Sequence, residues 1–310
     1  MTNEPDALVS VATFWAGGPL LALDRAAIAS FALHGHRTTL FSFDPVADPP
    51  PGVAIADAAD IVPREAMSAF IYEGKPNLSH FSDYFRYRLF ARTEHAWIDA
   101  DLLNLRRVPT PADGMLFACE TRTSLCGAIM RIKSDDPRLG DLLRRTEALM
   151  HRELVWGATG PRLLTNVFGA RTIIRHAAPP ETYFPIHYDD FFLPFLPEAA
   201  EICEELCRQA FTLHLWNNLV VQLGYWKDMA PPRGSWMWKQ LQAMGLLSLF
   251  TDTYPAEVMR AMVTNWRFRK SGGDIGVVKL TQQIVPSIIR TARPRLRRLS
   301  LRTAARSRIS

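Results

Sequence analysis

The sequence between residues 82 and 106 reads Ser-Asp-Tyr-Phe-Arg-Tyr-Arg-Leu-Phe-Ala-Arg-Thr-Glu-His-Ala-Trp-Ile-Asp-Ala-Asp-Leu-Leu-Asn-Leu-Arg. The apolar side chains of its first half recur at helical spacing: Phe85, Leu89 and Phe90. This spacing predicts a helix, with Ser82 or Asp83 as its N-terminal cap. In the second half, Ala-Trp-Ile at 96–98 is a short apolar run typical of a buried strand. The stretch therefore predicts a helix followed by a strand.

The predicted strand ends on Asp99 and Asp101, two carboxylates separated by one small residue. Alternation along an extended chain points both to the same side. Two negative charges this close repel each other, and a divalent cation between them removes the repulsion. Mg²⁺ or Mn²⁺ held by carboxylates keeps open positions for substrate phosphates. For such a pair taken alone, the alternative is a solvated turn.

The same stretch resembles the sugar-nucleotide site of glycosyltransferases that carry an Asp-x-Asp motif. The similarity is to glycosyltransferase family 32, its bacterial polysaccharide relatives and the glucosylating clostridial toxins, which share Ser-Asp-x-x-Arg, a Gly-Gly turn, an aromatic residue and Asp-x-Asp. The matching residues of this chain are Ser82, Asp83, Arg86, Leu89, Trp97, Asp99 and Asp101. Glu94 and His95 replace the two glycines, so we expect the turn before the strand to be built differently.

This resemblance implies a hexosyltransferase that moves a sugar, with retention, from a nucleotide donor (a UDP-sugar) to a hydroxyl of a glycan or lipid-linked glycan. It implies that Asp101 binds Mn²⁺ or Mg²⁺ directly and that Asp99 contacts the metal through water or the ribose. Asp83 and Arg86 are expected to hold donor-sugar hydroxyls and phosphate. These four residues form the predicted catalytic group. The predicted donor-binding residues also include Trp15, Gly17, Ser82, Thr159 and Gly160.

A late segment, 211–215, reads as a buried strand that carries a lone histidine, His214. The residues alone favour a hydrogen-bonded core histidine. The resemblance, which includes a late histidine, implies instead that His214 completes the metal site, and neutral imidazole suits Mn²⁺ better than Mg²⁺. We assign the acceptor side to His187, Trp216 and Asn217.

The N-terminal segment predicts a β-α-β unit: a buried strand at 9–15, a glycine-rich turn, an amphipathic helix at 20–33 and a second strand at 38–43. A helical crossover joins parallel strands, and ligands in such sheets bind at the carboxyl ends of strands. Trp15 and Gly17 are therefore expected beside the nucleotide. By resemblance, the Trp15 ring stacks on the base, whereas its pattern alone is equally compatible with core packing.

Two further motifs fall between these regions. Strands are expected at 115–119 and 126–132, and a helix at 137–152. Thr-Gly-Pro at 159–161 is similar to the family and opens a helix, with Thr159 as its predicted cap. An ordinary Gly-Pro helix start is the alternative. Cys203 and Cys207 lie one helical turn apart, which favours a helix face over a zinc site.

Overall, the sequence predicts an α/β protein with a GT-A-like, mixed and mostly parallel sheet flanked by helices. The catalytic domain is expected to span residues 1–225, a helical extension that packs on it 226–280, and a basic, flexible tail 281–310. No stretch approaches the roughly 18 apolar residues of a membrane span, and the N-terminus lacks a signal-peptide pattern. We expect a cytoplasmic protein, peripheral on the inner face of the membrane.

Charge is concentrated in the tail. The chain has 36 Lys and Arg residues and 31 Asp and Glu residues, but residues 281–310 hold eight arginines and no acid. The remaining chain therefore carries 28 basic and 31 acidic residues. Arginines beside Ile and Leu favour association with an anionic membrane surface, with a disordered end as the alternative. Nucleic-acid binding would depend on the tail alone and is not expected.

Two other functions fit an Asp-x-Asp motif after a strand. A metal-dependent phosphohydrolase with an aspartyl nucleophile usually has Thr or Val two residues past the second Asp, where this chain has Leu103. A non-catalytic sugar- or membrane-binding module of the same fold is the third hypothesis. Both carboxylates and Arg86 are present, which favours an enzyme of polysaccharide biosynthesis over such a module.

Overall fold

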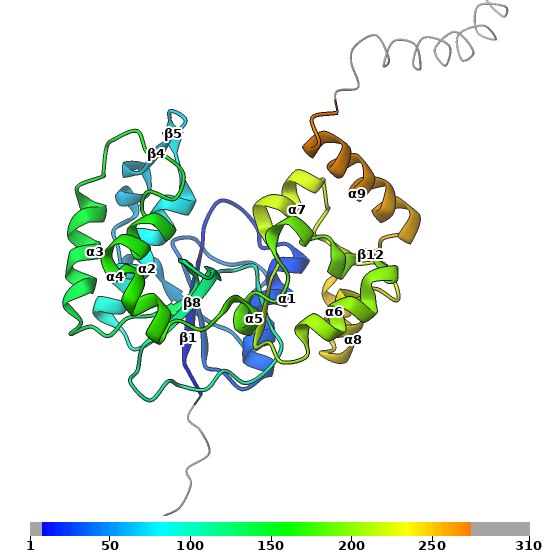
Figure 1. The fold of residues 1–310 in the computed structure, drawn as a ribbon, viewed down its shortest axis with the longest axis horizontal. Coiled ribbons are helices and arrows are strands. Elements are labelled where there is room, and N and C mark those ends of the chain that lie inside the picture. The colour runs from blue at the N-terminus through cyan, green and yellow to red at the C-terminus, as the bar shows by residue number, and fades with distance from the viewer. Residues whose placement is uncertain (1–7, 274–310) are drawn as a thin grey trace, which may run out of the picture. The chain divides into compact units, whose positions relative to one another are not determined.

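A mixed β-sheet forms the centre of the protein in the computed structural model, which describes residues 8–273 (Figure 1). Within these residues the sheet has six strands in the order β3-β2-β1-β6-β9-β8. Its strands are β1 (Val11–Trp15), β2 (Thr38–Ser42), β3 (Ala54–Asp57), β6 (Ala96–Ile98), β8 (Leu116–Thr121) and β9 (Ser124–Arg131). The first four run parallel to one another, whereas β9 is antiparallel to both β6 and β8. The predicted α/β class, with a mixed and mostly parallel sheet flanked by helices, is confirmed.

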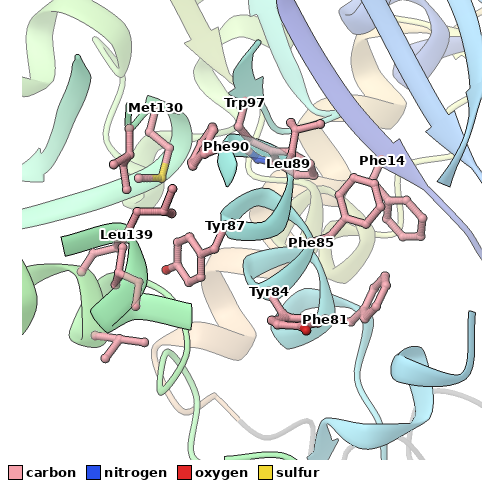
Figure 2. Packing of buried hydrophobic residues seen from close by; sticks show 14 of the residues in the cluster. Phe14, Phe81, Tyr84, Phe85, Tyr87, Leu89, Phe90, Trp97, Met130 and Leu139 are labelled. Carbon is pink, nitrogen blue, oxygen red and sulfur yellow. The ribbon is translucent and has the colours of Figure 1, made fainter. Parts of the chain in front are cut away.

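Alternating side chains along the strands pack into two separate hydrophobic cores, one on each face of the sheet. Ala12 and Phe14 of β1 pack with α2 (Leu78–Arg92), α3 (Pro137–Glu147) and α4 (Pro161–His176), whereas Val11 packs with Phe31 of α1 (Ala22–Leu33) on the opposite face. Figure 2 shows the first core, where aromatic side chains of α2 gather against Phe14 and Trp97. Helix α2 is thereby fixed against the strand that precedes Asp99.

Shorter elements complete the described part of the chain. A small hairpin joins β4 (Ile71–Tyr72) and β5 (Lys75–Pro76), and β7 (Leu102–Asn104) pairs antiparallel with β10 (Thr212–His214). The later elements are α5 (Pro180–Tyr183), α6 (Ala200–Cys207), α7 (Asn217–Leu223), β11 (Met229–Ala230), α8 (Trp236–Ala243), β12 (Asp252–Thr253) and α9 (Ala256–Lys270). Cys203 and Cys207 are both buried on α6, as a helix-face pair would be.

The chain divides into two compact units, residues 1–260 and 261–310. The predicted domain boundary at residue 225 stays a prediction. The predicted tail, 281–310, lies outside the described residues. Among the residues that the structure describes, we find no helix with the length and apolar character of a membrane span.

The start of α2 corrects the sequence prediction. Asn77, not Ser82 or Asp83, caps this helix, with its side-chain oxygen accepting the backbone N–H of His80. The helix therefore begins a full turn earlier, directly after the β4–β5 hairpin, and Asp83 lies inside it. The apolar spacing of Phe85 and Leu89 continues backwards through Phe81 and Leu78, so the sequence already contained a sign of this earlier start.

The turn before β6 is built without glycine, as expected. Among the described residues other than glycine, only Glu73, His151 and Trp216 have positive φ, so Glu94 and His95 stay in ordinary backbone regions. The Thr93 hydroxyl instead donates to the carbonyl of Leu89 and accepts the N–H of His95. A side-chain turn thus replaces the Gly-Gly turn.

Most other boundaries differ from prediction by one or two residues, and three differences near the site are of more consequence. The helix expected at 137–152 ends at Glu147. Helix α4 has Gly160 as its cap position, without a side-chain cap, so Thr159 does not cap it. The strand expected at 211–215 is limited to Thr212–His214, and Trp216, left-handed with φ 54°, is the N-cap of α7.

Candidate active site

The Asp-x-Asp turn lies at the carboxyl edge of the parallel strands. β6 ends at Ile98, Asp99 follows directly, and Asp101 precedes β7. β1 pairs parallel with β6, so Trp15, the last residue of β1, lies at the same edge. Trp15 and Ala100 also pack against one small apolar cluster, formed by Leu20, Ile28 and Leu40. The edge is where ligands bind in sheets of this kind.

The β1–α1 turn beside this edge depends on glycine. Gly17 and Gly18 have φ of 94° and 126°, which side chains rarely allow. The indole N–H of Trp15 donates to the carbonyl of Gly18 at 2.8 Å and holds the turn closed. Trp15 is partly buried, and both glycines are exposed. Gly17 therefore presents backbone, rather than a side chain, at the carboxyl edge.

Asp99, Asp101 and His214 come together, as predicted from the resemblance. One ligand atom from each lies within 4.8 Å of the others, and within the described part of the chain this is the only group of three or more His, Cys, Asp or Glu residues placed to hold a metal ion. The pairing of β10 with β7 is responsible, because its register sets His214 opposite Leu102, the residue after Asp101. The carboxylate and imidazole ligands that Mn²⁺ takes are therefore present together.

Asp101 is held from three directions by residues 214–217. Its Oδ2 lies 3.3 Å from His214 Nε2 and accepts the backbone N–H of Asn217 at 2.7 Å, while its carbonyl accepts the N–H of Leu215. The positive φ of Trp216 turns the chain so that the Asn217 N–H faces this carboxylate. Burial opposes ionisation of Asp101, but His214 and these hydrogen bonds outweigh it and lower the pKa of Asp101 to about 2.

His214 is the other half of this ion pair. Burial alone would lower its pKa, but the charge and hydrogen bond of Asp101, together with Asp99, raise the pKa of His214 above its ordinary 6.5. The Trp216 ring stacks on the imidazole, with ring centroids 3.9 Å apart. Nδ1 of His214 is buried without a hydrogen-bond partner. Because Nε2 faces the carboxylates, it is the nitrogen placed for a metal.

The ion pair predicts how stability depends on pH. The Asp101 contribution is complete above its ordinary pKa of 3.8 and is lost as pH falls toward about 2. The His214 contribution is complete below 6.5 and is lost as pH rises through its raised pKa. The free energies of unfolding of the wild type and His214→Gln, measured in urea with a chelator, should therefore differ most between pH 3.8 and pH 6.5. A difference that stays constant into alkaline pH would contradict the ion pair.

Asp99 is held through one of its oxygens. Oδ1 accepts the indole N–H of Trp97 at 2.6 Å and lies 3.2 Å from Nη2 of Arg86. Oδ2 makes no hydrogen bond to the described residues, and 28% of the Asp99 side chain is exposed. Trp97 and Arg86 thus orient the Asp99 carboxylate through Oδ1, and Oδ2 is left for a ligand.

Arg86 and Asp83, predicted to hold the donor, lie inside the protein with 4% and 7% exposure. Arg86 donates to the carbonyl of Gly127 at 2.6 Å and lies 3.3 Å from Asp83. Burial would lower its pKa, but Asp99 and Asp83 raise the pKa of Arg86, so the charge is fixed. A Cβ at Gly127 would overlap the guanidinium, so the glycine makes room for it. Direct donor contacts of Arg86 and Asp83 stay a prediction.

The remaining predicted residues are spread around this centre. The Ser82 hydroxyl donates to the carbonyl of Ser79 within α2. Gly160 lies against Asp83, since a Cβ there would come 2.8 Å from its Oδ2. On the proposed acceptor side, exposed His187 stacks on Tyr188, whose ring makes an edge contact with Trp216. Asn217 has a buried Oδ1 without a hydrogen-bond partner.

Sequence reasoning missed several residues that support the site. They are His80 and Tyr87 on α2, Gly127 on β9, and the buried ion pair of Asp24 with Lys227. His80, Asp83 and Tyr87 share one helix face, at positions i, i+3 and i+7, so their polar spacing on a buried helix was a usable indication. The contacts of Gly127 and Lys227 are long-range and had no local pattern.

Known proteins resemble this chain in sequence over part of its length. No family model matches the chain. It is 25% identical over 148 residues to lactosylceramide 4-alpha-galactosyltransferase of Pongo pygmaeus, and 24% identical over 148 residues to the Rattus norvegicus protein of that name. In sequence, the chain is similar to glycosyltransferases. Each match covers 44% of this chain but only 66% and 40%, respectively, of those relatives.

Solved structures of glycosyltransferases are also similar. PaToxG glycosyltransferase has a TM-score of 0.37 and 9% identity, over 52% of this chain and 69% of that one. The apo structure of the bifunctional glycosyltransferase WbbM has a TM-score of 0.44 and 11% identity, over 84% of this chain and 53% of that one.

Proposed function

We propose that this protein is a metal-dependent glycosyltransferase that moves a hexose from a nucleotide-sugar donor, a UDP-sugar, to a hydroxyl of a glycan or lipid-linked glycan. The observation that carries the proposal is the grouping of Asp99, Asp101 and His214 at the carboxyl edge of the parallel strands. Sequence similarity to two galactosyltransferases supports it independently.

The chemistry of the three side chains fits a divalent cation. Two carboxylates repel each other unless a positive charge lies between them, and here the imidazole of His214 supplies that charge to Asp101. A cation at Nε2 requires the imidazole without this proton, so binding is coupled to proton release. The nitrogen ligand favours Mn²⁺ over Mg²⁺. When bound, the cation offsets the negative charge that develops on the leaving diphosphate.

The chain's own residues divide the remaining tasks. We assign Trp15, at the end of β1, to stacking on the base, with its indole N–H donating to Gly18 within the turn. The exposed backbone of Gly17 lies beside it. Asp99, oriented by Arg86 and Trp97, presents its second oxygen to the cation or ribose. By the motif resemblance to glycosyltransferase family 32, we assign Asp83, Arg86, Ser82, Thr159 and Gly160 to the donor side and expect the transfer to retain anomeric configuration.

We assign the acceptor side to a series of ring contacts that leads from His187 to His214. Tyr188 and Trp216 connect exposed His187 to the metal-ligand group through ring contacts. Rings of this kind offer an apolar face to the C–H surface of a sugar. The two relatives are named for lactosylceramide, a glycolipid, so a lipid-linked acceptor is the first class to try. On the sequence resemblance, we propose a role in polysaccharide biosynthesis at the inner membrane face.

The proposal predicts that donor binding needs the cation. In a thermal-shift panel of UDP-sugars, with UDP-galactose included, a matching donor should raise the melting temperature only when Mn²⁺ is present. A ligand at about 100 times its dissociation constant stabilises the folded state by about 2.7 kcal/mol, which such an assay detects. Isothermal titration with UDP and Mn²⁺ then measures the two affinities. Equal shifts with Mn²⁺ and with a chelator would contradict the metal-dependent site.

A further inference from the structure

Three residues of one α2 face converge on a single threonine outside the helix. His80 Nδ1 lies 2.7 Å from the Thr159 hydroxyl, which itself donates to Asp83 Oδ2 at 2.7 Å. The Tyr87 hydroxyl donates to the Thr159 carbonyl at 2.8 Å. The relative exposure of Thr159 is 0%. Thr159 is therefore fixed at both its side chain and its backbone.

The directions of these hydrogen bonds follow from the number of protons that each group can donate. A hydroxyl has one proton, and Thr159 gives it to the acceptor Asp83. Its oxygen can then only accept from His80, so His80 carries its proton on Nδ1. Nε2 of His80 is buried without a hydrogen-bond partner, and burial lowers the pKa of His80. A neutral imidazole with a fixed Nδ1–H tautomer results.

Ion pairs of Arg86 extend this series to the Asp-x-Asp turn. Asp83 uses Oδ2 for Thr159 and Oδ1 for Arg86, and the same Nη2 of Arg86 that contacts Asp83 also contacts Asp99. Gly160 closes the other side, since a Cβ there would press on both oxygens of Asp83. Arg86 cannot turn without losing one of its two carboxylates. The position of the Asp99 carboxylate therefore depends on groups two side chains away.

We propose that Thr159, oriented by His80, is a positioning residue of the active site. It fixes Asp83, Asp83 fixes the guanidinium of Arg86, and Arg86 fixes Asp99 toward its ligand. What Asp99 binds rests on the proposed function, but the coupling between Thr159 and Asp99 does not. Groups that hydrogen-bond directly to a metal ligand, as Arg86 does to Asp99, commonly change metal affinity about 10- to 100-fold when replaced, and this range is the upper limit expected for Thr159.

Paired variants separate the hydroxyl from the methyl group. Thr159→Val keeps the shape and removes the hydroxyl, whereas Thr159→Ser keeps the hydroxyl. Thr146→Val is the matched control, because Thr146 is equally buried but its hydroxyl has no hydrogen-bond partner. In the presence of UDP, we expect Thr159→Val to lose Mn²⁺ affinity about tenfold. Thr159→Ser and Thr146→Val should bind like the wild type.

A second pair tests His80 in the same way. His80→Asn keeps a donor near the position of Nδ1, whereas His80→Phe keeps a flat ring without one. Rescue of Mn²⁺ affinity by Asn but not by Phe supports the positioning role. Equal affinity of both variants to the wild type would overturn it.

A double-mutant cycle of Thr159→Val with Asp99→Asn, measured by urea unfolding, decides the coupling without any ligand. The two side chains make no hydrogen bond to each other, so independent sites would give additive losses. Non-additive losses support the proposal, and additive losses overturn it. If the wild type binds neither Mn²⁺ nor UDP, the proposed function fails while this cycle still decides the inference.

Discussion

Replacing Asp101 with asparagine is expected to lower sugar transfer by on the order of 100-fold or more, the scale of losing one preorganised electrostatic group. The Asp101 carboxylate contacts both His214 and the backbone N–H of Asn217. Its replacement removes the negative charge from this position. Asparagine keeps the shape and can still accept the Asn217 N–H. We therefore expect a stability loss of roughly 1–3 kcal/mol, too small to unfold the protein. Steady-state transfer assays and urea unfolding measure the two effects.

The matched control for this variant is Asp135→Asn, which removes the same charge from an exposed residue before α3. It should transfer sugar at the wild-type rate. Titration with Mn²⁺ in the presence of UDP adds a readout that does not depend on turnover. If the Asp101 variant turned over donor like the control, the proposed metal site would be wrong.

The central sheet was predictable because its information is local. The strand at 11–15 alternates between two buried faces, the helix after it is continuous, and the short run at 96–98 ends on acidic residues. Each of these patterns is contained within about 15 residues. A parallel β-α-β unit then fixes which strand ends share an edge. The neighbourhood of Trp15 and Asp99 followed from that rule.

The contacts that bring His214 and Thr159 to the site were not predictable from local sequence, because they depend on pairings between distant segments. His214 joins the carboxylates only through the register of β10 on β7, a contact across more than 100 residues that the local pattern does not contain. The resemblance supplied it instead. Thr159 was expected at a helix cap, whereas its hydroxyl is used by Asp83. A buried carboxylate needs hydrogen-bond donors, and the Thr159 hydroxyl donates to Asp83 instead of capping α4.

Arg86 shows how a motif residue can be recognised while its surroundings are not. It lies three residues after Asp83 on α2, and the two side chains form an ion pair at 3.3 Å. Its contacts with Gly127 and Asp99, however, come from β9 and the end of β6. These contacts explain why a guanidinium with several fixed donors is needed at this position.

Replacing Lys227 with methionine is expected to destabilise the fold by about 3–5 kcal/mol, the cost of leaving a buried charge without its partner. Lys227 Nζ lies 2.6 Å from Asp24 Oδ1, and these side chains are only 7% and 3% exposed. The same segment accepts the backbone N–H groups of Leu23 and Ala22 at the start of α1. Loss of the pair should therefore loosen the helix that follows the β1 turn.

The pH dependence of this loss distinguishes an unpaired charge from lost packing. Burial already raises the pKa of Asp24, although Lys227 lowers it in part, and removing Lys227 should raise it further. A carboxyl with a raised pKa costs stability as pH rises above its ordinary 3.8, so urea unfolding should show a larger deficit near pH 7 than near pH 4. Adding Asp24→Asn to the variant should remove this pH dependence. Lys239→Met, at an exposed residue of α8, is the control and should change stability by less than about 0.5 kcal/mol. A deficit that does not change with pH would assign the loss to packing rather than to the charge of Asp24.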